Sequence, residues 1–310
     1  MKVLISSRSF GKINSDPIDK LKDAGFEVVV NPLDKKLNEN ELIELIDDAV
    51  GLIAGTEPIT ESVLKQATSL KVISRYGVGL DNIDLDAANR RGVEVCNTPN
   101  APAKAVAELT LSLILNIMRR IPESSQAMKE RVWKPNMGNS LYGKTLGIVG
   151  LGRIGKELTK LVEPFNVEIL AFEKYPDDPF IVSHNIKLVS LEDVLSRSDV
   201  VSIHLPLMEE TFNIISSKEL ALMKRNSFLI NTARGGLVDE NALKYYLEKG
   251  LIAGAALDAF ENEPYKGGLL DLDNVLLTPH IGTYTEETRM IMEIETVNNL
   301  LKVLAGVGAK

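Results

Sequence analysis

Gly150-Leu151-Gly152-Arg153-Ile154-Gly155 is the stretch from which the fold can be inferred, because its glycines follow the spacing G-x-G-x-x-G. The apolar run 145–149 before it is typical of a buried strand, and apolar residues recur at helical spacing over 154–162. On a strand-to-helix turn, the first glycine allows the tight turn, the second admits a pyrophosphate, and the third packs helix against strand. The helix N-terminus adds unpaired N–H groups that favour an anion. The motif therefore predicts a dinucleotide site.

An acidic residue supports this interpretation. A strand predicted over 167–172 ends at Glu173, about 20 residues after the motif, where a carboxylate binds the ribose 2′-hydroxyl. The alternative, a structural glycine-rich turn, does not account for this acid. Glutamate should repel a 2′-phosphate, which favours NAD as the cofactor, while the adjacent Lys174 leaves NADP tolerance open.

Composition excludes several classes of protein. The chain has 310 residues, enough for about two domains, and a net charge of −8 that offers no basic surface to nucleic acid or anionic lipid. It contains no apolar run of about 18 residues, and residues 1–8 become charged too early for a signal peptide. The single cysteine, Cys96, cannot form an intrachain disulfide, and packing is favoured over a nucleophilic role. We expect a cytoplasmic protein with neither a membrane nor a nucleic-acid partner.

Strand and helix patterns alternate through the first 97 residues. Short apolar runs predict strands at 3–5, 26–30, 52–54, 72–74 and 93–95. A helix with one apolar face is expected over 42–49, ending before Gly51. Alternation of this kind implies a parallel sheet with helices on both faces.

A second α/β region follows the turn-rich segment 97–102. It opens with a long helix near 103–118, whose broad apolar stripe suits either core packing or a subunit contact. Strands are predicted at 200–203, 228–230, 255–257 and 275–277. The final helix, near 286–304, comes after this sheet is complete and is expected to pack back on the first domain. We predict an α/β fold of two doubly wound, Rossmann-like domains with parallel sheets, 1–98 plus 284–310 and 99–283.

The histidines are the candidates for proton transfer, which alcohol oxidation by a nicotinamide enzyme requires. His184 lies in a polar loop and is expected at the surface. His204 ends the strand 200–203 and precedes Pro206, on the edge where open α/β sheets bind ligands, so it is expected to line the cofactor. His280 follows the strand 275–277, and Gly282 allows close approach; a structural loop histidine is the alternative.

Two further strand ends carry charged residues. Arg234 follows the strand 228–230 and precedes two glycines, a position from which its planar guanidinium can bind a carboxylate. Glu263 follows the strand 255–257 and could accept the second ring N–H of His280, favouring the imidazolium. Arginine, glutamate and histidine thus follow three consecutive strands.

With these motifs in order, the chain resembles the D-isomer-specific 2-hydroxyacid dehydrogenases over nearly its whole length. The matching segments are 76–84, 97–99, 150–155, 231–239, 258–264 and 278–282. The resemblance implies that Arg234 binds the substrate carboxylate and carbonyl, that His280 is the acid/base, and that Glu263 is its partner. It also implies that the N–H groups of Val78 and Gly79 bind the carboxylate, with Arg75 near the substrate.

The family also implies the remaining assignments. The first domain would be a flavodoxin-like substrate-binding domain, the second would bind NAD, and a cleft would separate them. The partner would be a second copy of the chain, forming a homodimer through the second domain, and no metal is expected. The residues expected to line the cofactor are Gly150, Gly152, Arg153, Ile154, Gly155, Glu173, His204, Pro206, Thr232, Ala233, Asp258 and Gly282.

Substrate choice is the least determined feature. The phosphoglycerate dehydrogenase branch is the most similar, which implies oxidation of D-3-phosphoglycerate to 3-phosphohydroxypyruvate in serine biosynthesis, in a short form without a regulatory domain. Gly55, however, stands where some enzymes of that branch place a phosphate-binding arginine, and we hypothesise that Arg8 supplies the missing charge. A glyoxylate or hydroxypyruvate reductase is the alternative within the fold. An NAD-sensing corepressor-like protein is the alternative from another class.

Overall fold

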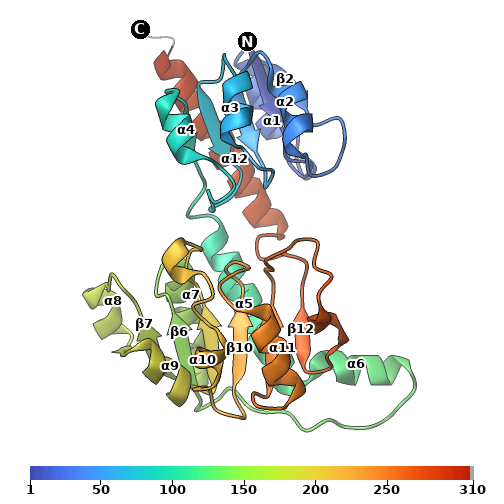
Figure 1. Cartoon of the computed structure of the whole chain (residues 1–310), viewed down its shortest axis with the longest axis vertical. Helices are drawn as coiled ribbons and strands as arrows, with labels where there is room; N and C mark the ends of the chain where they lie inside the picture. Colours follow the sequence, from blue (N-terminus) through green and yellow to red (C-terminus); the bar gives the residue numbers. More distant parts are fainter. Residues whose placement is uncertain (308–310) are drawn as a thin grey trace. The chain divides into compact units, whose positions relative to one another are not determined.

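Two units divide the chain in the computed structural model, which describes residues 1–307 (Figure 1). Unit 1 comprises Met1–Pro102 and the segment from Tyr284 onward, and unit 2 comprises Ala103–Thr283. Of the predicted segment 284–310, the last three positions lie outside the described residues. Within the described residues, no helix is both long enough and apolar enough to cross a membrane.

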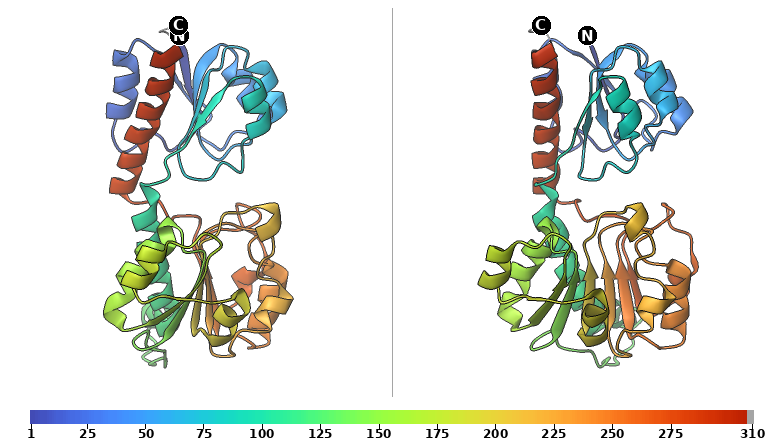
Figure 2. Two further views of the ribbon diagram at one scale, coloured as in Figure 1. Left: turned by 90° about the vertical axis from the view of Figure 1, so that its left-hand side faces the viewer. Right: turned by 60° about the vertical axis from the view of Figure 1, so that its left-hand side comes forward.

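Unit 1 is built on a parallel sheet in the order β2-β1-β3-β4-β5. Its strands are β1 (Lys2–Ile5), β2 (Glu27–Val30), β3 (Ala49–Ala54), β4 (Val72–Arg75) and β5 (Glu94–Cys96). One face is covered by α1 (Asp16–Asp23) and α12 (Glu286–Val307), and the other by α2 (Glu39–Ile46), α3 (Glu61–Gln66) and α4 (Leu85–Arg90) (Figure 2). Because both faces are covered, the central strands contain runs of consecutive buried apolar residues, as in Val3–Ile5.

One local expectation in unit 1 is wrong. The helix predicted over 42–49 ends at Ile46, and β3 already begins at Ala49, so that Gly51 lies inside a strand instead of ending a helix. A Cβ at Gly51 would lie 3.0 Å from Leu300 Cδ1 of α12. Glycine at this position lets the last helix pack closely on the sheet, a contact between residues far apart in the sequence.

Unit 2 contains a second parallel sheet, in the order β12-β11-β10-β9-β6-β7-β8. Its strands are β6 (Thr145–Val149), β7 (Glu168–Phe172), β8 (Lys187–Leu188), β9 (Val200–Ile203), β10 (Phe228–Asn231), β11 (Gly254–Leu257) and β12 (Val275–Leu277). One face carries α5 (Pro102–Arg119), α7 (Arg153–Val162) and α8 (Asp178–Ser183), and the other carries α9 (Leu191–Arg197), α10 (Ser217–Leu220) and α11 (Glu240–Glu248). Short 3₁₀ turns η1 (Glu163–Phe165), η2 (Glu209–Thr211) and η3 (Gly268–Asp271) complete it.

The two strand orders confirm the predicted fold class. In unit 2, the chain runs outward from β6 to β8 and then continues from β9 on the other side of β6, which is the Rossmann order. In unit 1, the corresponding reversal lies between β1 and β3, as in flavodoxin-like sheets. In open α/β sheets, ligands bind outside the carboxyl ends of the strands at such reversals. Each unit therefore has one preferred edge for a ligand.

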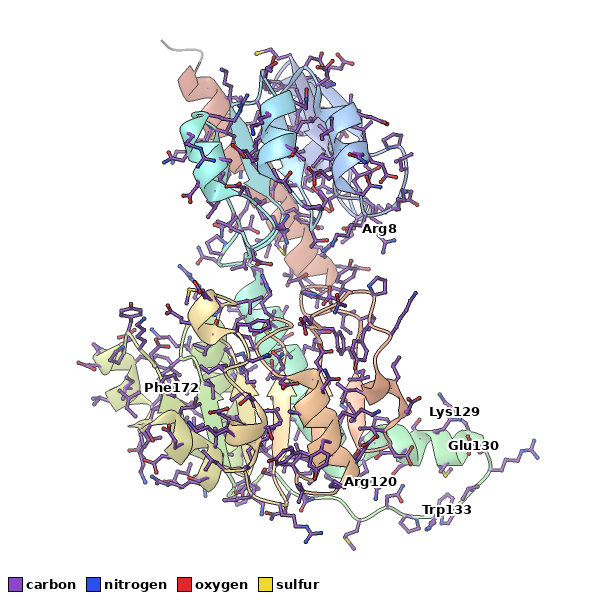
Figure 3. The ribbon with its side chains drawn as sticks, in the orientation of Figure 1. Arg8, Arg120, Lys129, Glu130, Trp133 and Phe172 are labelled. Atoms are coloured by element: carbon purple, nitrogen blue, oxygen red, sulfur yellow. The ribbon has the colours of Figure 1, made fainter. Side chains whose placement is uncertain are left out.

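An arm leaves unit 2 after α5. It contains α6 (Ile121–Lys129) and an irregular segment in which Trp133 is 85% and Met137 is 92% exposed. Figure 3 shows Trp133 on the extended part of this arm, pointing away from the sheet. Gly138 closes the arm at its base, because a Cβ there would lie 2.7 Å from the Met118 carbonyl oxygen. The apolar stripe of α5 packs in the core of unit 2.

Candidate active site

The three glycines of the turn after β6 have three different surroundings. Gly150 has a φ of +98°, a conformation that side chains disfavour. A Cβ at Gly155 would lie 2.6 Å from the Gly150 carbonyl oxygen, so this glycine lets α7 approach the turn. A Cβ at Gly152 would have no described protein atom within 4 Å. The open space beside Gly152, at the N-terminus of α7, fits the pyrophosphate of NAD.

Glu173 is held beside this turn, directly after β7. Its carboxylate accepts the Leu151 N–H at 2.7 Å and the Tyr175 N–H at 2.9 Å. The neighbouring Lys174 points its ammonium to Glu210 at 3.1 Å, and the hydrogen bond to this carboxylate raises the pKa of Lys174. Glu173, which the sequence predicts to bind the ribose, is therefore fixed next to the Gly150–Gly155 turn. Lys174 instead pairs with Glu210.

His204 lies across the strand reversal from the turn. A Cβ at Gly150 would be 2.9 Å from the His204 carbonyl carbon, which places the ends of β6 and β9 in direct contact. The ring Nε2 is 2.9 Å from Ser202 Oγ, whereas Nδ1 is buried and has no hydrogen-bond partner among the described residues. Burial lowers the pKa of His204 to about 3, so the ring is neutral at physiological pH. A neutral ring with one unsatisfied nitrogen suits a bound cofactor better than it suits proton transfer.

The loop after β10 carries Arg234. Asn231 organises this loop, because its Nδ2 donates to the Arg234 carbonyl at 2.8 Å and its Oδ1 accepts the Ala233 N–H at 3.1 Å. A Cβ at Gly235 would overlap the carbonyl group of Phe260. The loops after β10 and β11 therefore touch through a position that only glycine can occupy. Asn231 was not among the predicted site residues; its place at the end of β10, shortly before Arg234, is the signal that could have indicated it.

Glu263 and His280 come together as expected. His280 Nδ1 lies 2.9 Å from Glu263 Oε1 and 3.1 Å from Oε2, and the same carboxylate accepts the Phe260 N–H at 3.2 Å. His280 has a φ of +54°, an unusual conformation for this residue type that is often found at functional sites. With Nδ1 engaged, Nε2 is the ring nitrogen that can exchange a proton with a ligand. Both side chains are partly exposed, which allows that access.

Asp258 holds the loop that presents His280. This carboxylate is 1% exposed, and it accepts three hydrogen bonds, from Thr278 Oγ1 at 2.6 Å, from the Ile281 N–H at 2.8 Å and from the Gly282 N–H at 2.9 Å. Burial raises the pKa of Asp258, and the three donors act in the opposite direction. A Cβ at Gly282 would lie 3.2 Å from this carboxylate. The cofactor role expected of both residues stays a prediction; the contacts make them positioning residues for the loop.

The other predicted cofactor residues lie on the same edge of the sheet. Thr232 is 7% exposed and its hydroxyl is 2.8 Å from Thr110 Oγ1 of α5, and Ala233 is 8% exposed. Arg153 and Ile154 form the first turn of α7, and the carbonyl of Pro206 accepts a hydrogen bond from Thr211 Oγ1 at 2.7 Å.

His184 differs from expectation. It is not a freely solvated loop residue: its side chain is only 20% exposed, it pairs with Glu163, and its ring stacks 4.1 Å from Phe180. The ring joins the end of α8 to η1 and takes no part in the strand-end cluster. An apolar neighbour four positions earlier was the available signal for this packing.

In unit 1, a loop after β4 carries the predicted substrate residues. The Arg75 side chain is folded over Gly77, where a Cβ would lie 2.6 Å from its Nη1. Asn97 Nδ2 donates to the Val78 carbonyl at 2.7 Å, and Thr98 Oγ1 accepts the Gly77 N–H at 3.1 Å. Within residues 1–307, the amides of Val78 and Gly79 donate to no backbone acceptor. The segment 97–98 thus fixes a loop whose next two N–H groups are available to a ligand.

Comparisons with known proteins agree with this geometry. A family model described as "D-isomer specific 2-hydroxyacid dehydrogenase, NAD binding domain" matches residues 111–282, more than half of the chain. The D-3-phosphoglycerate dehydrogenase of Methanocaldococcus jannaschii is 40% identical over 312 residues, 99% of this chain, and the chain spans 58% of the length of that relative. The glyoxylate reductase of Thermococcus litoralis is 41% identical over 276 residues, covering 86% of this chain and 83% of that protein.

Solved structures show the same relationship. The TT0316 protein from Thermus thermophilus superposes with a TM-score of 0.89 at 38% identity, covering 99% of this chain and 97% of the other. Sequence and architecture therefore agree over both units. The chain belongs to the D-isomer-specific 2-hydroxyacid dehydrogenases, a family of NAD-dependent oxidoreductases.

Proposed function

We propose that this protein interconverts a D-2-hydroxy acid and its 2-oxo acid with NAD as the cofactor. The observation that carries the proposal is the Glu263–His280 pair, with His280 Nδ1 2.9 Å from the carboxylate. The pair lies after β11 and β12, on the sheet edge that also carries the Gly150–Gly155 turn. A carboxylate-oriented histidine on the same sheet edge as a dinucleotide turn is the arrangement that hydride transfer to and from a carbinol carbon requires.

The proposed mechanism assigns proton transfer to His280. The chemistry that NAD supplies when bound is acceptance of a hydride from C2 of the hydroxy acid. His280 Nε2 removes the hydroxyl proton in oxidation and returns it in reduction. Glu263 keeps the proton on Nδ1 and stabilises the imidazolium that forms. In reduction, His280 must start protonated, because it donates the proton that the C2 oxygen gains.

Substrate orientation is assigned to arginine and to backbone amides. Arg234 would bind the carboxylate and the C2 oxygen with its planar guanidinium. The available N–H groups of Val78 and Gly79 would bind the carboxylate as a second set of donors. Both assignments rest on the family resemblance, and the open amides of the β4 loop support the second.

Two substrate classes compete within this reaction. D-3-phosphoglycerate is the substrate predicted from the sequence, and a relative of that name matches 99% of the chain. An unphosphorylated 2-oxo acid such as glyoxylate or hydroxypyruvate is the second candidate, because Gly55 offers no cation at the end of β3, and a relative named glyoxylate reductase matches 86% of the chain. The surroundings of Gly55 favour the second candidate.

We also propose a homodimer that forms through unit 2. The arm 120–142 presents large apolar side chains to solvent, including Trp133 and Met137. A cavity of about 280 Å³ at the base of the arm is lined by Ile117, Arg120 and Asn274 among others. Exposed apolar groups of this size are typical of surfaces that bind another protein, and a second copy of this chain is the partner that the family resemblance implies.

A reductase assay tests the function directly. NADH absorbance is followed with phosphohydroxypyruvate, hydroxypyruvate and glyoxylate, for the native protein and for His280→Gln. We expect turnover of at least one acid and a loss of about 10²-fold or more in the variant, because a general acid contributes that much. His184→Gln is the matched control and should retain activity. A folded native protein that binds NADH but reduces none of the acids contradicts the proposal and supports an NAD-sensing binding protein.

A further inference from the structure

The reversal of strand order in unit 1 lies between β1 and β3, which makes the carboxyl ends of these strands the preferred ligand edge of this unit. The loop after β3 begins at Gly55, and Tyr76 of the β4 loop donates its N–H to the Ala54 carbonyl at 2.9 Å. The end of β3 therefore adjoins the loop that carries Val78 and Gly79. A substituent on a substrate whose carboxylate is bound by those amides would meet the β3 end.

A buried carboxylate, that of Glu57, lies at this edge of the sheet. Glu57 is 2% exposed, and its Oε1 accepts hydrogen bonds from the Ser6 hydroxyl at the end of β1 and from the Gly55 N–H at 2.8 Å. Asn82 Nδ2 donates to the Glu57 carbonyl at 2.6 Å and fixes the backbone of the same loop. Glu57 thus links the ends of the two strands at which the order reverses. Nothing in its local sequence pattern indicated that this residue is buried.

Because residue 55 is a glycine, no side chain of this residue competes with the Glu57 carboxylate for space. A Cβ at Gly55 would lie 2.7 Å from Glu57 Oε2 and 3.3 Å from the Ser7 Cα. A side chain at this position, including the arginine that binds phosphate in some relatives, would have to displace Glu57. The observed position of the Glu57 side chain therefore depends on glycine at position 55.

Buried charges of both signs lie at this edge. Arg75 ends β4, and Arg289 of α12 donates to Ser9 Oγ in the loop after β1; both residues are at most 9% exposed. A buried charge is poorly screened by water and salt, so Glu57 would repel a dianion brought to the ends of β1 and β3.

Arg8, in the loop after β1, is exposed (Figure 3); the pKa of Asp34 is lowered mainly by the hydrogen bond from Lys12, and Arg8 adds only a small effect. The exposed cation of Arg8 is screened by solvent, whereas the Glu57 carboxylate is buried.

We propose that Glu57 is a specificity-determining residue that excludes phosphorylated 2-oxo acids and restricts this enzyme to small unphosphorylated ones. The inference rests on the proposed dehydrogenase function and names the substrate class of that site. A buried negative charge acts on a phosphate dianion through space but has little effect on an uncharged substituent. The carboxylate therefore discriminates between substrates by charge.

The test compares kcat/KM for phosphohydroxypyruvate and hydroxypyruvate, with NADH, in the native protein and in Glu57→Gln. Glutamine keeps an acceptor oxygen for Ser6 and Gly55 but removes the charge. We expect the native enzyme to prefer hydroxypyruvate, and the variant to raise the ratio in favour of the phosphorylated acid by about tenfold, mainly through KM. Glu94→Gln removes the same charge from the exposed first residue of β5, at the opposite edge of the sheet, and should leave the ratio unchanged.

Each outcome separates the proposals. A native preference for phosphohydroxypyruvate, or a ratio that moves equally in Glu57→Gln and Glu94→Gln, overturns the role of Glu57. Arg8→Ala checks the opposing hypothesis, which requires a higher KM for the phosphorylated acid alone. If Glu57→Gln does not fold, the ratio of kcat/KM for the two acids is measured in Glu57→Ala instead. The preference of the native protein is a second test that needs no variant. Absence of any turnover, glyoxylate included, is instead a failure of the proposed function.

Discussion

The histidines of this chain differ in their surroundings more than in their sequence neighbourhoods. His280 faces a carboxylate on the ligand edge, His204 is buried and neutral, and His184 packs on Phe180 beside Glu163. Glu263 and His280 each follow a strand, and parallel strands end at one edge of a sheet. This was enough to predict that the two residues pair. It was not enough to predict that His204 stays neutral, since burial of the ring depends on packing.

At the residue scale, Glu263→Gln tests the charge beside His280. Glutamine keeps a hydrogen-bond acceptor but no longer stabilises an imidazolium, so kcat should fall by about 10²-fold. Single-turnover rates of reduction with NADH measure the effect. Glu261→Gln, an exposed neighbour, is the control, and an unchanged rate in Glu263→Gln contradicts the assignment.

The Gly150–Gly155 turn allows a second test at this scale. At Gly152, an added methyl group meets no described protein atom within 4 Å, whereas at Gly155 it meets a carbonyl oxygen at 2.6 Å. Gly152→Ala should therefore fold normally but weaken NADH binding by about tenfold or more, since it fills the space meant for phosphate. Gly155→Ala should lower the melting temperature. Fluorescence titration and thermal unfolding distinguish the two; unaltered NADH affinity in Gly152→Ala would falsify the placement of the cofactor.

At the scale of elements, polar contacts between strand ends determine how loops are presented. Asp258 at the end of β11 holds the loop after β12, and Asn231 at the end of β10 shapes the loop that carries Arg234. At the opposite edge, Asp199 accepts the Thr145 N–H at 3.0 Å and pairs with Lys224 at 2.9 Å, which joins the starts of β6 and β9. These contacts connect the ends of neighbouring strands and the loops that follow them.

Asp199 gives a prediction with a defined pH dependence. Burial opposes ionisation of this carboxyl, but the Thr145 N–H and Lys224 outweigh it and lower its pKa. A lowered pKa in the folded state means that the ion contributes stability above the unfolded pKa of about 3.9, and that this contribution is lost as the pH falls through the folded pKa.

Asp199→Asn should therefore destabilise the protein by at most about 1 kcal/mol at neutral pH, because the pair is partly solvent-screened. The difference from the native protein should shrink below about pH 4. Denaturant midpoints at neutral and acidic pH measure it, with the exposed Asp23→Asn as a control for net charge. A difference that grows on acidification contradicts the sign.

For the whole molecule, the arm 120–142 is the feature that the core of unit 2 does not explain. Its base is closed by Gly138 and by the Asn139 N–H, which donates to the Met118 carbonyl at 2.7 Å, yet its apolar side chains are left in solvent. Figure 3 shows the arm as the part of unit 2 that departs from the layered α/β body.

The proposed homodimer can be tested on this arm. Replacing Trp133 and Met137 together by serine should convert the dimer to a monomer, because these side chains would lose the apolar area buried at the interface. Sedimentation velocity at micromolar concentration measures the mass, and circular dichroism checks the fold. Val182→Ser changes an apolar side chain of α8 that is 80% exposed and should not alter the mass. A native protein that sediments as a monomer contradicts the proposal.

The sequence by itself determined the alternation of strands and helices, the glycine turn after β6 and the strand ends that bear Arg234, Glu263 and His280. These features follow from local periodicity and from chain order, which a parallel sheet converts into one common edge. Only the tertiary structure decided the burial of Glu57 beneath Gly55, the close packing of Gly51 against Leu300, and the use of Asp258 to hold the His280 loop. The physical reason is that each of these depends on atoms from distant elements, whose positions local sequence patterns do not contain.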